Sequence, residues 1–220
     1  MSINSEVELE AMMREAVLHC EQGDFAKAVE LYRTILARYE GHAQACEYAC
    51  AGLGESYLNL RDLDLAESYF RQALNYDPME PRWHYLLGFT YSVGRQWDKA
   101  VTEFDICVKQ DDNEPEYLRG LGWVILQAGQ KDRGLSYLHQ ALVLAPDMVN
   151  VLTDLSAAYL SKCDFDEALK YAGRAVEVAP DNPLAQEVYM NIRYFQKEYA
   201  RLVKASPRTR RNRKPKSDGE

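Results

Sequence analysis

Three side chains of types that bind metal ions follow one another at helical spacing. His42, Cys46 and Cys50 are each four residues apart, so they could share one face of a helix. Imidazole nitrogen and thiolate sulfur are both zinc ligands, but a structural zinc site uses four of them. No fourth ligand lies nearby in the sequence, and His42 precedes the expected helix. We therefore interpret the two cysteines as buried thiols, and we expect neither a metal nor another cofactor.

The residues that could catalyse a reaction do not converge either. The four histidines His19, His42, His84 and His139 occupy unrelated positions in the repeat described below. No nucleophile, metalloprotease or phosphate-binding motif stands in a suitable context. A catalytic site needs acid, base or nucleophile groups that converge on one centre. The sequence therefore predicts a protein that is not an enzyme.

Charge is distributed unevenly along the 220 residues, whose net charge is −8. From Lys204 onward the chain holds seven basic and two acidic residues, so the preceding body is strongly acidic. An acidic body argues against nucleic-acid binding by that part of the chain. The composition, with 47% hydrophobic residues, allows a sizeable core.

The cellular compartment is inferred from the cysteines and the start of the chain. Five cysteines are an odd number, and none are spaced as CxxC, which favours reduced thiols in a reducing compartment. We find neither a secretory signal nor an apolar run of membrane-spanning length. These observations predict a cytoplasmic protein without a membrane partner.

The elements that would position a binding site follow a period of 34 residues. Small, aromatic and turn-forming residues return at this interval, and a fixed period of this size is typical of a stacked solenoid. The recurring sets are Gly54, Gly88, Gly122 and Ser156; Tyr57, Tyr91, Ile125 and Tyr159; Ala66, Ala100, Gly134 and Ala168; and Phe70, Phe104, Leu138 and Ala172.

Within each period, apolar residues at helical spacing flank a turn, which predicts two helices per repeat. The expected fold is all-α, with about eleven helices in antiparallel pairs. We expect a solenoid over residues 1–204 and a basic, disordered tail over 205–220. The predicted repeats are about 9–42, 47–80, 81–114, 115–148 and 149–182, followed by a capping helix at 183–204.

The first repeat departs from the period. Ala28 precedes its counterpart Ala66 by 38 residues instead of 34, so four extra residues lie around positions 39–43. They lengthen a helix by about one turn or enlarge the connecting loop.

The pattern resembles the tetratricopeptide repeat family. The third repeat carries the family's small, aromatic, small and aromatic positions as Gly88, Tyr91, Ala100 and Phe104, and the fourth departs from it at Gly134 and Leu138. The resemblance implies a right-handed superhelix of helix pairs. It also implies that the first helix of each pair lines a concave face, which usually holds a peptide or another protein.

The resemblance places a set of aromatic and charged residues on that concave face. Aromatic residues together with Arg are typical of binding hot spots. A subgroup of the family binds the carboxyl terminus of chaperones through Lys and Asn residues, but Met13, Val17 and Gly52 stand at the corresponding positions here and argue against that ligand. The predicted protein-binding residues are Tyr48, Glu55, Arg82, Tyr85, Phe89, Arg119 and Trp123.

The sequence therefore predicts a non-enzymatic adaptor or chaperone-like scaffold that binds a partner segment in the concave groove. The alternative is a nucleic-acid-associated factor that contacts RNA or DNA through the basic run from Arg208 to Lys216. Self-association through the ends of the solenoid is a third hypothesis.

Overall fold

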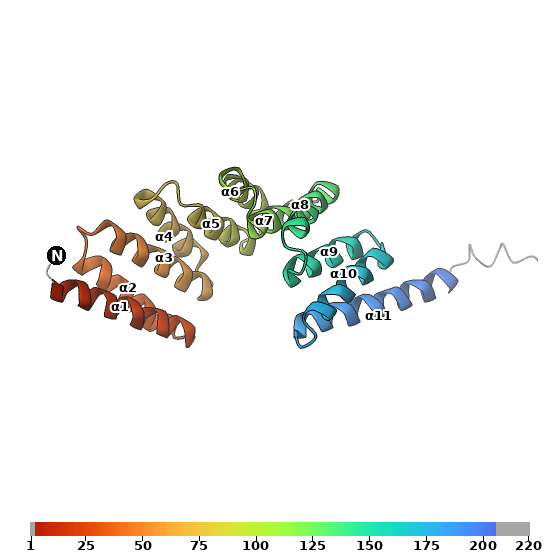
Figure 1. Ribbon diagram of the computed structural model, residues 1–220, viewed down its shortest axis with the longest axis horizontal. Coiled ribbons are helices and arrows are strands. Elements are labelled where there is room, and N and C mark those ends of the chain that lie inside the picture. Colours follow the sequence, from red (N-terminus) through yellow and green to blue (C-terminus); the bar gives the residue numbers. More distant parts are fainter. Residues whose placement is uncertain (1–2, 206–220) are drawn as a thin grey trace, which may run out of the picture. The chain divides into compact units, whose positions relative to one another are not determined.

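The computed structural model describes residues 3–205, and every regular element in this range is a helix. The all-α fold of about eleven helices is thereby confirmed. The helices, coloured along the chain in Figure 1, are α1 (Ile3–Glu21), α2 (Phe25–Arg38), α3 (Ala43–Asn59), α4 (Leu63–Tyr76), α5 (Pro81–Val93), α6 (Trp97–Gln110), α7 (Pro115–Gln127), α8 (Lys131–Leu144), α9 (Val149–Ser161), α10 (Phe165–Val178) and α11 (Pro183–Ala205).

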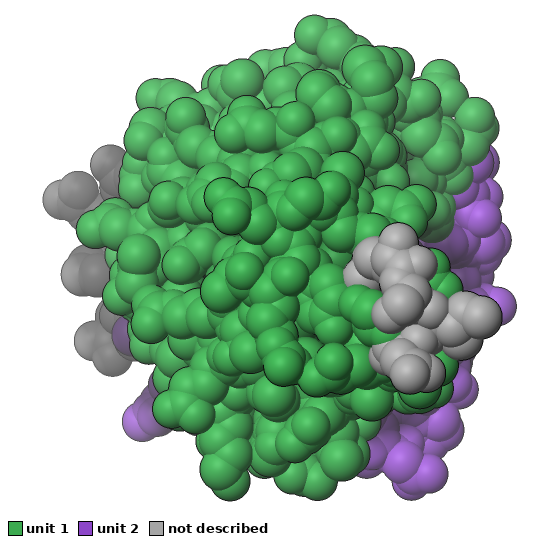
Figure 2. All heavy atoms as spheres, turned by 90° about the vertical axis from the view of Figure 1, so that its left-hand side faces the viewer, with its two compact units in different colours: residues 1–137 green, residues 138–220 purple. Residues whose placement is uncertain are grey.

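The chain divides into two compact units, residues 1–137 and 138–220, which Figure 2 shows in different colours. The first unit holds α1 to α7 and the first half of α8, and the second holds the rest of α8 with α9 to α11. Each unit has its own packing.

In the first unit every helix from α1 to α6 contacts the helix that follows it, and the odd-numbered helices also contact one another. The additional contacts are α1 with α3, α3 with α5, and α5 with α7. The odd-numbered helices therefore form one layer, and the even-numbered helices form a second layer beside it (Figure 1). This layer of odd-numbered helices is the surface that the sequence assigned to binding.

The turn inside each helix pair contains one residue with a left-handed backbone. Its φ angle is +76° at Gly23, +65° at Arg61, +55° at Arg95, +88° at Gly129 and +60° at Cys163. The last four of these positions are 34 residues apart. The repeat therefore fixes the backbone of its turn even where the residue is not glycine, although a side chain makes this conformation costly.

The four extra residues of the first repeat lengthen a helix. α3 has 17 residues, whereas α5, α7 and α9 have 13 each, and α2 has the same 14 residues as α4 and α6. The insertion is thus one additional N-terminal turn of α3, which begins at Ala43. α1 begins at Ile3, ahead of residue 9, where the first repeat was predicted to start.

The second unit is built around α10. α9 and α11 both contact α10, and α11 also contacts α9. Ala168 and Ala172 of α10 are fully buried beneath Ile192 of α11. Tyr199 of α11 reaches Phe165, the first residue of α10, with ring centroids 5.2 Å apart. α11 therefore covers an apolar side of α10, and its last turn continues beyond the start of α10 (Figure 1).

Two other expectations concern the basic tail and the absence of a membrane-spanning segment. The basic run from Arg208 to Lys216, with its expected disorder and nucleic-acid contact, lies outside them. Between residues 3 and 205, none of the helices combines the length and apolar content that a membrane span requires.

The turn geometry predicts the effect of adding a side chain at Gly129. Nothing lies within 4 Å of a Cβ atom built there, so Gly129→Ala introduces backbone strain without a clash. We expect the free energy of unfolding to fall by about 1 kcal/mol, the cost of a left-handed alanine. Urea denaturation followed by circular dichroism measures this. Gly41→Ala, also in open space but without the positive φ angle, is the control. Equal stability of the two variants would contradict the argument.

The packing of α11 predicts that Ile192→Ala destabilises the second unit. Ile192 is buried on α10, so its truncation leaves a cavity that typically costs about 2 kcal/mol or more. Met190 lies on the same helix but is largely exposed, and Met190→Ala is expected to unfold like the wild type. Thermal melts of both variants make the comparison, and equal melting temperatures would show that α11 does not stabilise α10.

Candidate functional site

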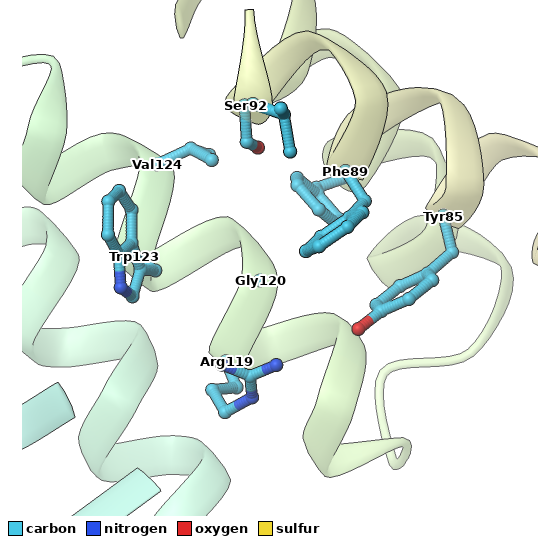
Figure 3. A pocket seen from close by; sticks show the side chains of 9 residues that line it. Tyr85, Phe89, Ser92, Arg119, Gly120, Trp123 and Val124 are labelled. Carbon is cyan, nitrogen blue, oxygen red and sulfur yellow. The ribbon is translucent and has the colours of Figure 1, made fainter. Parts of the chain in front are cut away.

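A pocket opens in the first unit where α5, α6 and α7 meet (Figure 3). Its volume is about 270 Å³, below the ~300–1,000 Å³ of ordinary small-molecule sites. It therefore suits one large side chain better than a cofactor. The lining residues are Tyr85, Phe89, Ser92 and Val93 of α5, Phe104 of α6, and Arg119, Gly120, Trp123 and Val124 of α7.

The buried ring of Phe104 forms the floor of the pocket between two glycines. A Cβ atom on Gly88 of α5 would lie 3.0 Å from this ring, and one on Gly120 of α7 would lie 2.6 Å from it. Tyr85 packs edge-on against Phe104, with ring centroids 5.4 Å apart. The two glycines thus let α5 and α7 approach a single ring, and that ring closes the bottom of the space between them.

Two further aromatic residues form the walls. Phe89 leaves 44% of its surface exposed although it is a large apolar residue. Trp123 lies on the α7 side of the pocket (Figure 3) and packs against Trp97 of α6, with ring centroids 6.0 Å apart. Trp123 is therefore held in place by its neighbour, while Phe89 presents apolar surface to solvent.

The polar groups beside the pocket interact with one another. The Arg119 Nε donates to Glu116 Oε2 at 2.7 Å, and the Tyr85 hydroxyl donates to the same oxygen at 3.4 Å. Burial raises the pKa of Tyr85, and Glu116 raises it further while Arg119 opposes the shift, so the phenol stays protonated at neutral pH. The Arg119 charge is compensated by Glu116, and the pocket offers an apolar interior beside a neutralised ion pair.

Four of the seven residues predicted for binding, Tyr85, Phe89, Arg119 and Trp123, line this one pocket. The other three lie elsewhere in the first unit. Glu55 and Arg82 form an ion pair with each other at 3.1 Å. Tyr48 lines a separate, open cleft together with residues of α1.

Five lining residues were not in the predicted set: Ser92, Val93, Phe104, Gly120 and Val124. Phe104 and Val124 are buried core residues, and in the sequence they follow the spacing of packing positions. Gly120 carries no side chain that a pattern could single out. The recurrence of Phe104 at 34 residues after Phe70 was the one available signal, and it indicated packing instead of a pocket floor.

The side chains of His42, Cys46 and Cys50 have structural roles. His42 caps the N-terminus of α3, its Nδ1 accepting from the Ala45 amide at 3.1 Å. The Cys46 thiol donates to the Tyr39 carbonyl at 3.2 Å. Burial raises the pKa of Cys50 to about 11, which keeps it a neutral thiol. Throughout residues 3–205, no three potential ligands gather closely enough to hold a metal ion.

A family model described as tetratricopeptide repeat matches residues 19–88 and 126–191, which together are more than half of the chain. The chain belongs to the tetratricopeptide repeat family. Proteins of this family are generally scaffolds for protein interaction, and the helix pairs and the layer of odd-numbered helices described above are their architecture.

Curated relatives match only parts of longer proteins. BBSome complex member BBS4 of Bos taurus is 26% identical over 142 residues, which are 64% of this chain and 27% of that protein. General transcriptional corepressor ssn6 of Schizosaccharomyces pombe is 31% identical over 105 residues, 47% of this chain and 9% of that protein. The chain thus spans only a minor part of the length of these relatives.

Solved structures share the fold at low identity. TTC0263, a thermophilic tetratricopeptide repeat protein of Thermus thermophilus, superimposes with a TM-score of 0.69 at 20% identity, over 84% of this chain and 98% of that one. YrrB, described as a tetratricopeptide repeat protein with an unusual peptide-binding site, superimposes with a TM-score of 0.59 at 21% identity, over 80% of this chain and 89% of that one. These likenesses establish the tetratricopeptide repeat fold.

The floor of the pocket predicts a strong effect of Gly120→Ala. The new methyl group would lie 2.6 Å from the Phe104 ring, and Gly88 restricts the ring on its other side. We expect a loss of about 1–3 kcal/mol in unfolding free energy, typical of overpacking. Gly173→Ala on α10 is the matched control, because its methyl group would meet only Tyr189, at 3.9 Å. Urea denaturation of both variants measures the difference.

A second change distinguishes the clash from a general effect on α7. Adding Phe104→Leu to the Gly120→Ala variant makes room for the methyl group and should recover part of the lost stability. If the two changes instead destabilise additively, Phe104 is not what opposes a side chain at position 120.

Proposed function

We propose that the chain is a protein-interaction scaffold that binds a partner segment by taking one apolar side chain of it into the pocket between α5 and α7. The exposed ring of Phe89 above the buried ring of Phe104 is the observation that supports this most directly. Large aromatic side chains are costly to leave in water, and clustered ones are typical of binding hot spots.

The volume and charge of the pocket favour a particular ligand side chain. A space of about 270 Å³ suits an aromatic or large aliphatic residue. Arg119 is compensated by Glu116 at 2.7 Å, so the pocket gives an entering carboxylate little net attraction. The partner segment is therefore expected to be uncharged at the residue that enters the pocket, with its flanking backbone lying along the layer of odd-numbered helices.

Binding of a chaperone's carboxyl terminus and a nucleic-acid role are less well supported. Met13 and Val17, which stand where the chaperone-binding subgroup has carboxylate-binding side chains, line an open cleft together with Tyr48. The basic tail that could contact RNA or DNA lies outside the described residues, and the body is acidic. Scaffolding through an apolar anchor is the function that the pocket favours.

The experiment selects ligands and then removes a wall of the pocket. Short random peptides displayed on phage are selected on the wild-type chain, and the affinity of the winning peptides is measured by calorimetry. We expect these peptides to share an aromatic or large aliphatic residue. Trp123→Ala should weaken them roughly thirtyfold, since truncation of a hot-spot aromatic costs about 2 kcal/mol or more.

Two further variants keep the test informative. Phe89→Ala removes a half-exposed ring with little effect on packing, so it should weaken binding even if Trp123→Ala disturbs α7. Met79→Ala truncates an exposed residue outside the pocket and should leave binding unchanged. Selected peptides that bind both aromatic variants as tightly as the wild type would show that the pocket is not the binding site.

A further inference from the structure

The first and last helices of the described chain each have an outward face that no described helix covers. α1 packs on α2 and α3 through buried residues that include Leu9 and Ala16. Val7 and Leu18 lie on the opposite side of the same helix, with 59% and 49% of their surfaces exposed. α1 therefore presents apolar side chains where a repeat placed before it would pack.

At Leu18 the outward face of α1 borders an open cleft between α1 and α3. Leu18 and Val17 line an open cleft of about 590 Å³ that Tyr48 of α3 closes on one side. Two acidic residues, Glu10 and Glu21, and one basic residue, Arg14, also line this cleft, so acidic side chains outnumber basic ones there. The helix as a whole carries five glutamates, Glu6, Glu8, Glu10, Glu15 and Glu21, against one arginine, Arg14.

α11 presents the complementary surface. Ile192 packs on α10 and Ala185 is also buried, whereas on the opposite side of the helix Met190 and Tyr194 are each 62% exposed. Basic residues accompany these two side chains. α11 holds Arg193, Lys197, Arg201 and Lys204 against only two glutamates, Glu187 and Glu198.

The two faces also match in spacing. Met190, Tyr194 and Arg201 follow one another at intervals of four and seven residues, which keeps them on one side of a helix. Val7, Ala11 and Leu18 have the same intervals on α1. Two helix faces with matching rows of side chains can pack as neighbouring helices do within the protein.

We propose that the outward face of α11 of one molecule docks on the α1 face of a second molecule of the same chain. Tyr194 and Met190 would enter the cleft beside Leu18. Arg193 and Lys197 would approach the glutamates that border this cleft. Apolar burial gives affinity, and the opposite charges fix the orientation and disfavour pairing of two α1 or two α11 faces. Because the joined surfaces differ, the contact is heterologous and builds chains or closed rings.

The test uses the full chain and one charge substitution on each face. Leu18→Lys places a like charge opposite the basic face, and Tyr194→Glu places one opposite the acidic face. Both residues are exposed, so the fold should survive, and circular dichroism together with unchanged binding of the selected peptides checks this. Val143→Glu, at an exposed residue of α8 that belongs to neither face, is the matched control.

Sedimentation velocity over a range of concentrations gives the outcome. The wild type and Val143→Glu should form species larger than a dimer as concentration rises. Each single variant should stay monomeric at concentrations roughly tenfold above those at which the wild type associates. An equal mixture of Leu18→Lys and Tyr194→Glu should form a dimer and nothing larger, because only one intact pair of faces remains.

Three results would overturn the proposal. A wild-type chain that stays monomeric has no such contact. Self-association of Leu18→Lys alone would indicate pairing of two α11 faces, and self-association of Tyr194→Glu alone would indicate pairing of two α1 faces. Peptide binding at the pocket between α5 and α7 is measured separately in every sample, so failure of this contact leaves the proposed function testable.

Discussion

An aromatic ring that rests on a glycine of the neighbouring helix is the contact on which this structure depends. Phe70 of α4 fills the space above Gly54, where a Cβ atom would lie 2.6 Å from the ring. Phe104 of α6 does the same at two glycines at once. Each such contact buries a ring completely or nearly so and brings the two helices of a pair together. In the first unit this close spacing sets how near neighbouring helices come, and with it the shape of the layer of odd-numbered helices.

The pocket is a consequence of the same packing. Because Phe104 is shared between Gly88 and Gly120, α5 and α7 flank one ring, and the space above that ring remains apolar. The charged residues nearby are already engaged with one another, as Arg119 with Glu116. The pocket is apolar inside and its neighbouring charges are compensated, so it suits an uncharged side chain. The packing of the core thus influences which partner the surface can bind.

The first and last described helices differ from the pocket in carrying a net charge. α1 is rich in glutamate and α11 in arginine and lysine, and the outward faces of both expose apolar residues. In a repeat protein each unit buries its apolar face on a neighbour, and within residues 3–205 the outward faces of α1 and α11 have no such neighbour. Because α1 is acidic and α11 is basic, the exposed face of each helix favours the other as its partner.

The sequence by itself determined the periodic part of this protein. Recurring small, aromatic and turn-forming residues at 34-residue intervals predicted the helix pairs, because local packing and turn formation repeat with the pattern. Tertiary structure decided what a single position does. It turned the four inserted residues into an extra turn of α3, drew Glu55 and Arg82 into their own ion pair, and made Phe104 and Gly120 a pocket floor. These outcomes depend on which side chains of different helices meet, and a spacing along one helix does not contain that information.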